Sequence, residues 1–272
     1  MYNIKVLIFL LISIIIIYSI YKKLIRNNTL GSEIEDFTVH GDRPFSKCYV
    51  INLTETNEGR RRWKLLNRHP IISPYINHFK GIFGKKYDYS QEVSNKVVSL
   101  DWDIGKWQGK RSKIIQMDSG EIGCILSHRL LWEKIYNEGL ESTLILEDDA
   151  IEMPINFIKL VNRLNIYLPQ DWDIFLLGFW LHRGDDGIKI NKHIYKVKNF
   201  CLLHSYIVSK QGAKKLLNLG IIDKPLDTWI SLHSNTLNIY RHNIVGGNRN
   251  RPSSRLILQR RQDKQIINTN NW

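Results

Sequence analysis

The stretch STLILEDDA, Ser142–Ala150, places three consecutive carboxylates directly after an apolar run. The run has the composition of a buried strand, so Glu147, Asp148 and Asp149 mark the point where that strand ends. Adjacent carboxylates repel one another, and each prefers to be protonated unless a cation or hydrogen-bond donors keep it charged. Oxygen ligands of this kind suit Mg²⁺ or Mn²⁺. The motif therefore indicates a divalent-metal site, and a solvated acidic turn is the alternative.

Strand and helix patterns alternate on both sides of this motif. Strands are predicted at residues 47–53, 76–83, 143–149, 172–179, 194–200 and 237–245, and helices at residues 60–69, 118–139, 155–168 and 210–220. Such alternation predicts an α/β domain with a largely parallel sheet. Ligands of open α/β sheets bind beyond the carboxyl ends of the strands, so we expect LILEDD to face the ligand.

The helix predicted at 118–139 has the clearest boundaries. Asp118 and Glu121 have the spacing of a capping box, and Gly139 is suited to end the helix. Ser127 and His128 fall in its middle, where a polar pair is expected to face a cleft or a buried hydrogen-bond network. Residues 84–118, just before it, read as a long connection.

Composition and charge limit the class of protein. The chain has 272 residues, 43% of them apolar, and a formal net charge of +13, which favours anionic partners such as nucleic acid, lipid head groups or nucleotide phosphates. It carries no zinc-finger spacing or other recognisable nucleic-acid module, so no specific nucleic-acid partner is expected. Three cysteines without close pairing argue against a disulfide framework and a cysteine-built metal site.

The N-terminus carries an apolar segment, Val6–Tyr21, flanked by basic residues. As a helix it would be roughly 24 Å long, slightly shorter than the hydrocarbon core of a membrane. No small-residue cleavage site follows, which favours an uncleaved anchor over a signal peptide. We therefore predict a single-pass membrane anchor at residues 1–21, a polar stalk at 22–45 and one folded domain at 46–272. The side of the membrane stays open.

Further blocks resemble a known enzyme family. They are YVINLTETNEGRRRW at 49–63, GEIGCILSHRLLWEKI at 120–135 and SYIVSKQGAKKLL at 205–217, followed by PLDTW at 225–229. Together with LILEDDA, and in this order, they resemble the signature blocks of glycosyltransferase family 25. That group contains lipopolysaccharide galactosyltransferases and collagen-type hydroxylysine galactosyltransferases. The resemblance runs from about residue 48 to 229.

The resemblance implies a GT-A fold, a Rossmann-like α/β domain that binds a nucleoside-diphosphate sugar, and makes 46–272 a single catalytic domain. It also implies a metal-dependent, inverting transfer of a hexose, galactose or glucose, from a UDP-sugar. The implied acceptor is a hydroxyl of a glycan or a hydroxylated protein, and the implied cofactor is Mn²⁺ or Mg²⁺. The ion would neutralise the leaving diphosphate.

The resemblance also implies roles for individual residues. Asp149 is expected as the principal metal ligand, and Asp148 or Glu147 as a contact to the donor ribose or to the water shell of the metal. Because Asp148 is part of the same motif, it is a second candidate metal ligand. Ser127 and His128 are expected at the donor site, whereas Cys124 is expected to be a small buried residue.

The first strand is expected to end at the nucleotide. There the resemblance implies Asn52 and Leu53 beside the nucleotide, and Arg60 or Arg61 as a phosphate contact. The segment TETNEGRRR is one residue longer than the family spacing, so the choice of arginine stays open.

An inverting transfer needs one general base for the acceptor hydroxyl. Asp227, in a loop after the last clear helix, matches the late aspartate of the family and is the first candidate. Glu121 and the pair Asp185–Asp186 are the alternatives.

Two other functions fit parts of the sequence. A non-catalytic relative that binds nucleotide sugars or glycans would keep the fold without turnover. A basic nucleic-acid-binding protein would show strongly salt-dependent binding, but the ordered motif blocks argue against it.

Overall fold

The computed structural model of the protein describes residues 44–182, 187–246, 253–254 and 256–257. The predicted anchor lies outside these residues, and so do the Asp185–Asp186 pair and all of the predicted stalk except residues 44 and 45. Among the described residues, no helix combines the length and the apolarity needed to cross a membrane.

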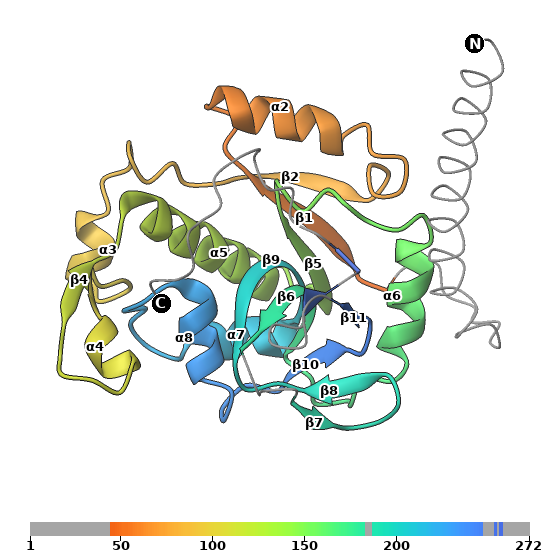
Figure 1. Ribbon diagram of the computed structural model, residues 1–272. Coiled ribbons are helices and arrows are strands. Elements are labelled where there is room, and N and C mark those ends of the chain that lie inside the picture. The colour runs from red at the N-terminus through yellow and green to blue at the C-terminus, as the bar shows by residue number, and fades with distance from the viewer. Residues whose placement is uncertain (1–43, 183–186, 247–252, 255, 258–272) are drawn as a thin grey trace, which may run out of the picture. The chain divides into compact units, whose positions relative to one another are not determined.

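A mixed sheet forms the centre of the described part (Figure 1). Its strand order is β2 (Ile76–Lys80), β1 (Lys47–Asn52), β5 (Ser142–Glu147), β9 (Phe200–Ser209), β6 (Ile174–Leu181), β10 (Ile239–His242), β8 (Ile194–Lys196) and β7 (Ile188–Lys189). The short strands β11 (Val245–Gly246) and β12 (Ser253–Ser254) continue it beside β6, and β3 (Asp101–Asp103) pairs separately with β4 (Ile114–Gln116).

Most of the central strands run in one direction, as the sequence predicts. β1 is parallel to β2 and to β5, and β6 is parallel to β10. Near one edge β8 pairs antiparallel with β10 and β7. In the middle of the sheet β9 pairs antiparallel with both β5 and β6 and therefore lies reversed between them. This reversal places the start of β9 beside the carboxyl end of β5, where ligands of α/β sheets bind.

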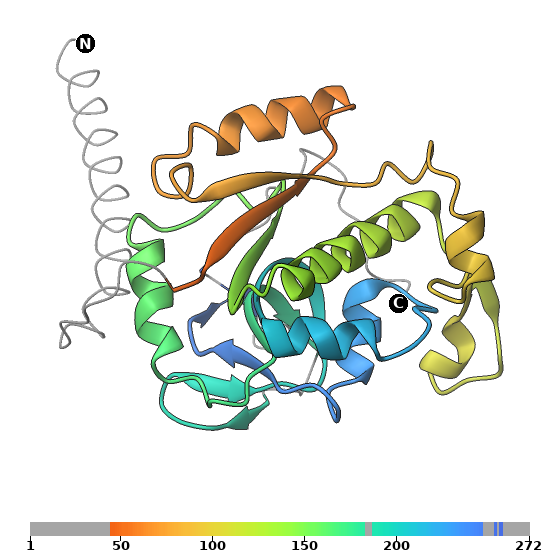
Figure 2. The ribbon, with the colours of Figure 1, turned by 180° about the vertical axis from the view of Figure 1, so that it is seen from behind.

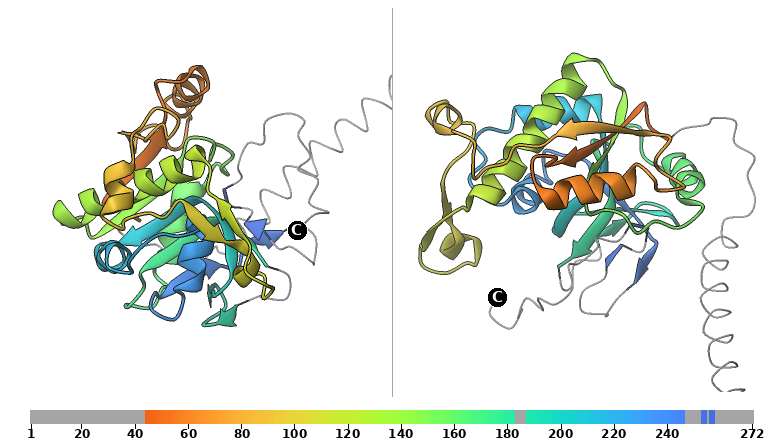
Figure 3. Two further views of the ribbon diagram at one scale, coloured as in Figure 1. Left: turned by 90° about the vertical axis from the view of Figure 1, so that its left-hand side faces the viewer. Right: turned by 90° about the horizontal axis from the view of Figure 1, so that it is seen from above.

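Helices pack against the sheet and bury its apolar side chains. The longer ones are α2 (Asn57–Leu66), α5 (Ser119–Asn137), α6 (Phe157–Asn165), α7 (Lys210–Leu217) and α8 (Leu226–Leu232), and α3 (Ser90–Ser94) and α4 (Ile104–Trp107) are short. Figure 2 shows α5 and α7 side by side, and the two helices are in contact. Their buried side chains join α8 and alternate residues of the strands in one cluster. Figure 3 shows α2 beside β1 and β2, well apart from α8.

The capping box predicted for α5 is confirmed. The Asp118 carboxylate accepts hydrogen bonds from the N–H groups of Gly120 and Glu121 at 2.7 and 2.8 Å, and the Glu121 carboxylate accepts from the Asp118 N–H at 2.9 Å. At the other end, Gly139 follows the helix with φ +68°, a conformation that glycine adopts without steric cost. These contacts fix where α5 begins and ends.

Two glycines bring the chain after β2 against the first turns of α5. A Cβ on Gly84 would lie 1.6 Å from the Ser119 carbonyl oxygen, and a Cβ on Gly123 would lie 2.6 Å from the Ile82 carbonyl oxygen. Backbone atoms cannot give way as flexible side chains do. The two segments therefore meet at this distance only because both positions are glycine.

We predict that Gly123→Ala destabilises the protein by about 1–3 kcal/mol, because the added methyl group forces the two segments apart. Alanine in an open helix position would instead stabilise by up to ~1 kcal/mol, so the sign of the change is decisive. The free energy of unfolding in urea measures it. Leu130→Ala, at an exposed position of the same helix, is the control; an unchanged or raised stability of the glycine variant would contradict the close contact.

Candidate functional site

The carboxyl ends of β1 and β5 meet at the Asp148 side chain. Asn52, the last residue of β1, is buried, and its amide donates to Asp148 Oδ2 at 2.7 Å. The same amide donates to the Gly59 carbonyl at 2.8 Å, so it also ties the first turns of α2 to the sheet. Arg62 of α2 donates to the other carboxylate oxygen, Asp148 Oδ1, at 2.6 Å. Both oxygens of Asp148 therefore have protein partners.

Arg62, and neither of the two arginines named from the sequence, lies at the carboxylates. Its guanidinium also lies 3.9 Å from Asp149 Oδ2. Arg60 donates to the Thr54 carbonyl, and Arg61 pairs with Glu58, both on the exposed side of α2. The helical period explains the difference and could have revealed it, because Arg62 stands three residues after buried Gly59 and four before buried Leu66.

A cavity of about 350 Å³ opens beyond these strand ends. Its size falls within the usual range for small-molecule sites. The sequence-predicted residues that line it are Leu53, Ser127, His128, Glu147, Asp148 and Asp149, and Arg62 lines it as well. Asn52 supports the same region from below through Asp148. The larger cavity is thus lined by the carboxylates that end β5, by the Arg62 guanidinium and by the start of α5.

Ser127 shapes the wall of this larger cavity. Its hydroxyl accepts a hydrogen bond from the Ile82 N–H at 2.8 Å and donates to the Gly123 carbonyl at 2.5 Å. Both partners are backbone groups, so Ser127 fixes the chain after β2 against α5. It belongs to the cavity that the sequence predicts, but its polar atom already has protein partners.

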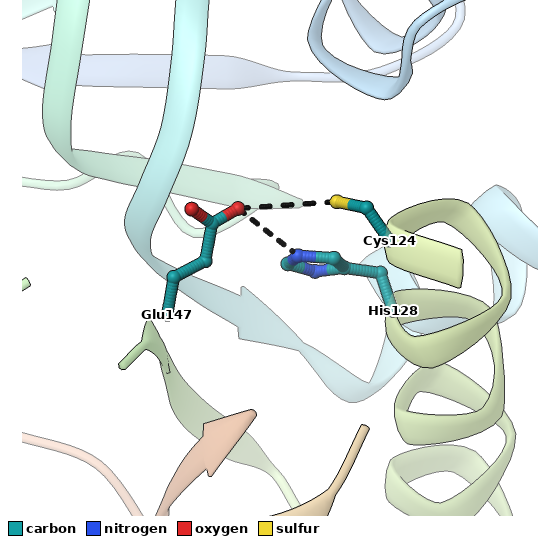
Figure 4. Close-up of side chains that lie close together, drawn as sticks. All are labelled: Cys124, His128 and Glu147. Atoms are coloured by element: carbon teal, nitrogen blue, oxygen red, sulfur yellow. Dashed lines mark hydrogen bonds and ion pairs between the residues drawn. The ribbon is translucent and has the colours of Figure 1, made fainter. Parts of the chain in front are cut away.

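His128, Cys124 and Glu147 all line the larger cavity, and their side chains come together (Figure 4). His128 Nε2 lies 3.5 Å and Cys124 Sγ 4.0 Å from Glu147 Oε1. One ligand atom from each of the three residues lies within 4.8 Å of the others, which makes them a possible metal cluster. On its other side, His128 Nδ1 lies 2.9 Å from the Tyr206 hydroxyl, which also accepts a hydrogen bond from the Trp132 indole.

A smaller cavity of about 180 Å³ adjoins the first. Glu147 and Cys124 line both cavities, and therefore lie where the two meet. The two base candidates, Glu121 and Asp227, line the smaller one together, although 106 residues separate them in the sequence. Leu202, Leu203, His204, Pro225 and Leu226 complete its lining.

The sequence suggested a loop at Asp227, and this was wrong: Asp227 lies in the first turn of α8. Its carboxylate accepts hydrogen bonds from the backbone N–H groups of Leu202 at 2.8 Å and Thr228 at 2.6 Å. Leu202 has φ +68°, a strained conformation for a residue other than glycine. The bond from its N–H to Asp227 holds this strained residue at the wall of the smaller cavity.

The pKa values of Glu121 and Glu147 are shifted in opposite directions. Burial raises the pKa of Glu121, and the negative charges of Asp118 and Asp227 add to that rise against the hydrogen bond from the Asp118 N–H. Burial also acts to raise the pKa of Glu147, but the contact with His128, with smaller contributions from His204 and Arg62, lowers it overall. Glu147 is therefore held as a carboxylate, while Glu121 binds a proton more readily than an ordinary glutamate.

The donor set fits a hard divalent cation at the larger cavity. Asp148 is neutralised by Arg62 and bonded by Asn52, and Asp149 Oδ2 lies 3.9 Å from the same arginine. An oxygen-only site of this kind suits Mg²⁺ or Mn²⁺. Both carboxylates line the larger cavity, and the role of Asp149 as the principal metal ligand stays a prediction.

Comparison with known proteins identifies relatives of this chain. The model of the family described as glycosyltransferase family 25 (LPS biosynthesis protein) matches residues 45–229. A glycosyltransferase 25 family member of Anopheles gambiae is 30% identical over 200 residues, 69% of this chain and 31% of its own length. Procollagen galactosyltransferase 1 of Danio rerio is 26% identical over 70% of this chain and 32% of its own length. Procollagen galactosyltransferase 2 of Homo sapiens is 27% identical over 70% of this chain and 30% of its own length.

The chain thus spans about a third of the length of these curated relatives. Among solved structures, the crystal structure of A197 from STIV overlaps at a TM-score of 0.32 and 13% identity, covering 62% of this chain and 93% of its own, a likeness too low to support an argument. The family match covers most of the chain and includes the strand ends, α5 and the start of α8, which together form the two cavities. The chain belongs to glycosyltransferase family 25.

Proposed function

We propose that this protein is a glycosyltransferase of the GT-A type that moves a hexose from a UDP-sugar to a hydroxyl of a glycan or hydroxylated protein. One observation carries the proposal: a carboxylate-lined cavity and a smaller cavity with two further carboxylates meet at Glu147. The relatives named procollagen galactosyltransferases support galactose as the first donor sugar to test and glucose as the second.

In this proposal the larger cavity holds the nucleotide and the diphosphate, and we name it the donor cavity. Asp149 would hold Mn²⁺ or Mg²⁺, with Asp148 oriented behind it by Asn52 and Arg62. The bound ion would supply charge neutralisation of the leaving diphosphate. Arg62 contributes a second positive charge at the same place and contacts Asp149 from the protein side.

The smaller cavity, the acceptor cavity in this proposal, holds the attacking hydroxyl. Its oxygen attacks C1 of the hexose, the bond from C1 to the phosphate oxygen breaks, and UDP leaves with the electron pair. The hydroxyl proton passes to a general base. Glu121 suits this step better than Asp227, because its pKa is raised and only one of its oxygens has a hydrogen-bond partner among the described residues. Both oxygens of Asp227 accept backbone N–H groups.

A non-catalytic relative that binds the same nucleotide sugars would share the donor cavity. It would differ in the acceptor cavity, where a raised carboxyl pKa would have no purpose. Measuring hydrolysis as well as binding separates the two functions.

The first prediction concerns Asp149. The full chain with Mn²⁺ should gain thermal stability in the presence of one UDP-hexose and hydrolyse it slowly, and Asp149→Asn should reduce the turnover by about 100-fold or more, because several kcal/mol of charge stabilisation are lost. Asp101→Asn, at an exposed position of β3, is the control. If no nucleotide sugar gives a metal-dependent response, the donor-cavity assignment is wrong.

The second prediction concerns Glu121. Glu121→Gln should lower kcat by about 10²- to 10⁴-fold, because an amide cannot accept the proton. Stability should be kept, since glutamine also serves in a capping box, and a carboxyl whose pKa is raised by burial does not stabilise the fold when ionised. Asp101→Asn, at an exposed position of β3, is the control, because Asp118 itself contributes to the raised pKa of Glu121.

The sign of the pH dependence follows from the same shift. Because the pKa of Glu121 is raised, kcat/KM should increase with pH through a value above that of an ordinary glutamate. This acidic limb should disappear in Glu121→Gln. An unchanged limb in that variant, together with a lost limb in Asp227→Asn, would assign the base to Asp227 instead.

We also propose that residues 1–21 hold the protein at a membrane, on the basis of the apolar segment Val6–Tyr21. The full chain should sediment with membranes, and a chain starting at residue 40 should not. Equal sedimentation of the two chains would contradict the anchor.

A further inference from the structure

His128 Nε2 is among the buried polar atoms at the two cavities that lack a hydrogen bond in the described part of the chain. It lies 3.5 Å from Glu147 Oε1, close to that carboxylate but outside good hydrogen-bond geometry. Buried polar atoms in proteins are nearly always satisfied, so an orphan at a cavity wall suggests that a ligand group completes it.

The hydrogen-bond chain behind His128 determines which ring nitrogen carries the proton. The Trp132 indole can only donate, and it donates to the Tyr206 oxygen at 2.8 Å. The Tyr206 hydroxyl then has a proton to donate, and the acceptor within reach in the described structure is His128 Nδ1 at 2.9 Å. Nδ1 is therefore the acceptor, and in the neutral ring Nε2 carries the hydrogen.

This tautomer argues against a metal ion at the cluster of His128, Cys124 and Glu147. A metal ligand nitrogen must offer a lone pair, and Nε2 offers an N–H. Binding through Nε2 would move the proton to Nδ1 and leave the Tyr206 hydroxyl proton without its acceptor. Burial and the surrounding carboxylates also raise the pKa of the Cys124 thiol.

The N–H of His128 and the carboxylate of Glu147 offer a donor and an acceptor side by side. A hydroxyl group satisfies both, because its oxygen accepts from the N–H while its hydrogen is donated to the carboxylate. A phosphate oxygen would accept from His128 but would be repelled by Glu147. The chemistry of the pair therefore fits a neutral hydroxylated ligand.

The position of His128 and Glu147 indicates which hydroxylated ligand they bind. This step rests on the proposed function. C1 of the transferred hexose must lie between the leaving diphosphate and the acceptor hydroxyl. His128 lines the donor cavity, and Glu147 lines both cavities at their junction. The sugar ring occupies this junction when the reacting groups are in place.

We propose that His128 and Glu147 together bind one hydroxyl group of the transferred hexose and so select the donor sugar. Tyr206 and Trp132 are positioning residues, because they set the tautomer of His128 without touching the sugar. In this proposal His128 contacts the hexose, while Asp149 and Arg62 act at the diphosphate.

The test compares UDP alone with UDP-hexose and a set of monodeoxy UDP-hexoses, each with Mn²⁺. The wild-type protein should bind one deoxy donor at least tenfold more weakly than the parent donor. Glu147→Gln and Tyr206→Phe should both lose most of that discrimination, because buried polar groups left unpaired are what reject the deoxy sugar. Tyr206→Phe, which changes a residue outside the lining of both cavities, should bind UDP within about twofold of wild type. Tyr49→Phe, which removes a tyrosine hydroxyl elsewhere in the same core, is the control.

A second readout needs no donor sugar. Imidazole ¹⁵N NMR of the wild-type protein should show His128 with its proton on Nε2, and Tyr206→Phe should change that signal. A proton on Nδ1 in the wild type would overturn the proposal.

The outcomes distinguish a failure of the sugar-binding role of His128 and Glu147 from a failure of the proposed function. If UDP binds with Mn²⁺ but both variants discriminate between the deoxy donors as the wild type does, the sugar-binding role of the pair is wrong and the proposed function stands. If UDP does not bind with Mn²⁺ at all, the proposed function fails and this inference fails with it.

Discussion

The site depends on the carboxylate of Asp148. It joins three elements, because it directly follows β5, Asn52 at the end of β1 donates to one of its oxygens, and Arg62 of α2 donates to the other. Hydrogen bonds to charged groups contribute roughly 1.5–3 kcal/mol each, and the loss of the carboxylate would leave the buried Asn52 amide short of an acceptor. On the proposed function, Asp148 then has a structural role and Asp149 meets the cation.

Local patterns in the sequence predicted the parts of the site that depend on neighbouring residues. The capping box of α5 needs only Asp118 and Glu121, and the end of β5 follows from an apolar run that meets three carboxylates. Arg62 needed one further step, because the phase of α2 relative to Gly59 and Leu66 decides which arginine faces the sheet. Helix α8 also left a signal, since Leu226, Trp229 and Ile230 have helical spacing and are buried, but its seven residues follow a proline and resemble a turn.

Contacts between distant segments could not be predicted from such patterns. His128 and Tyr206 are 78 residues apart, and their hydrogen bond exists because β9 enters the sheet antiparallel beside β5. The same holds for Glu121 and Asp227, which share a cavity only after α5 and α8 pack together. Neither the period of a helix nor the alternation of a strand carries information about these pairings. Pairing depends on how the whole sheet is assembled.

The reversed direction of β9 bears on how the specificity of such a protein can change. In a purely parallel sheet, the residues beyond the strand ends come from loops that leave each strand. Here the first residues of β9, from Phe200 to His204, arrive at that edge from a preceding loop, and Leu202 to His204 line the smaller cavity. Insertions or deletions before residue 200 can therefore remodel this cavity while β5, and the carboxylates at its end, stay in register with β1. On the proposed function, the acceptor side of the site can then change without altering the donor side, although one sheet carries both.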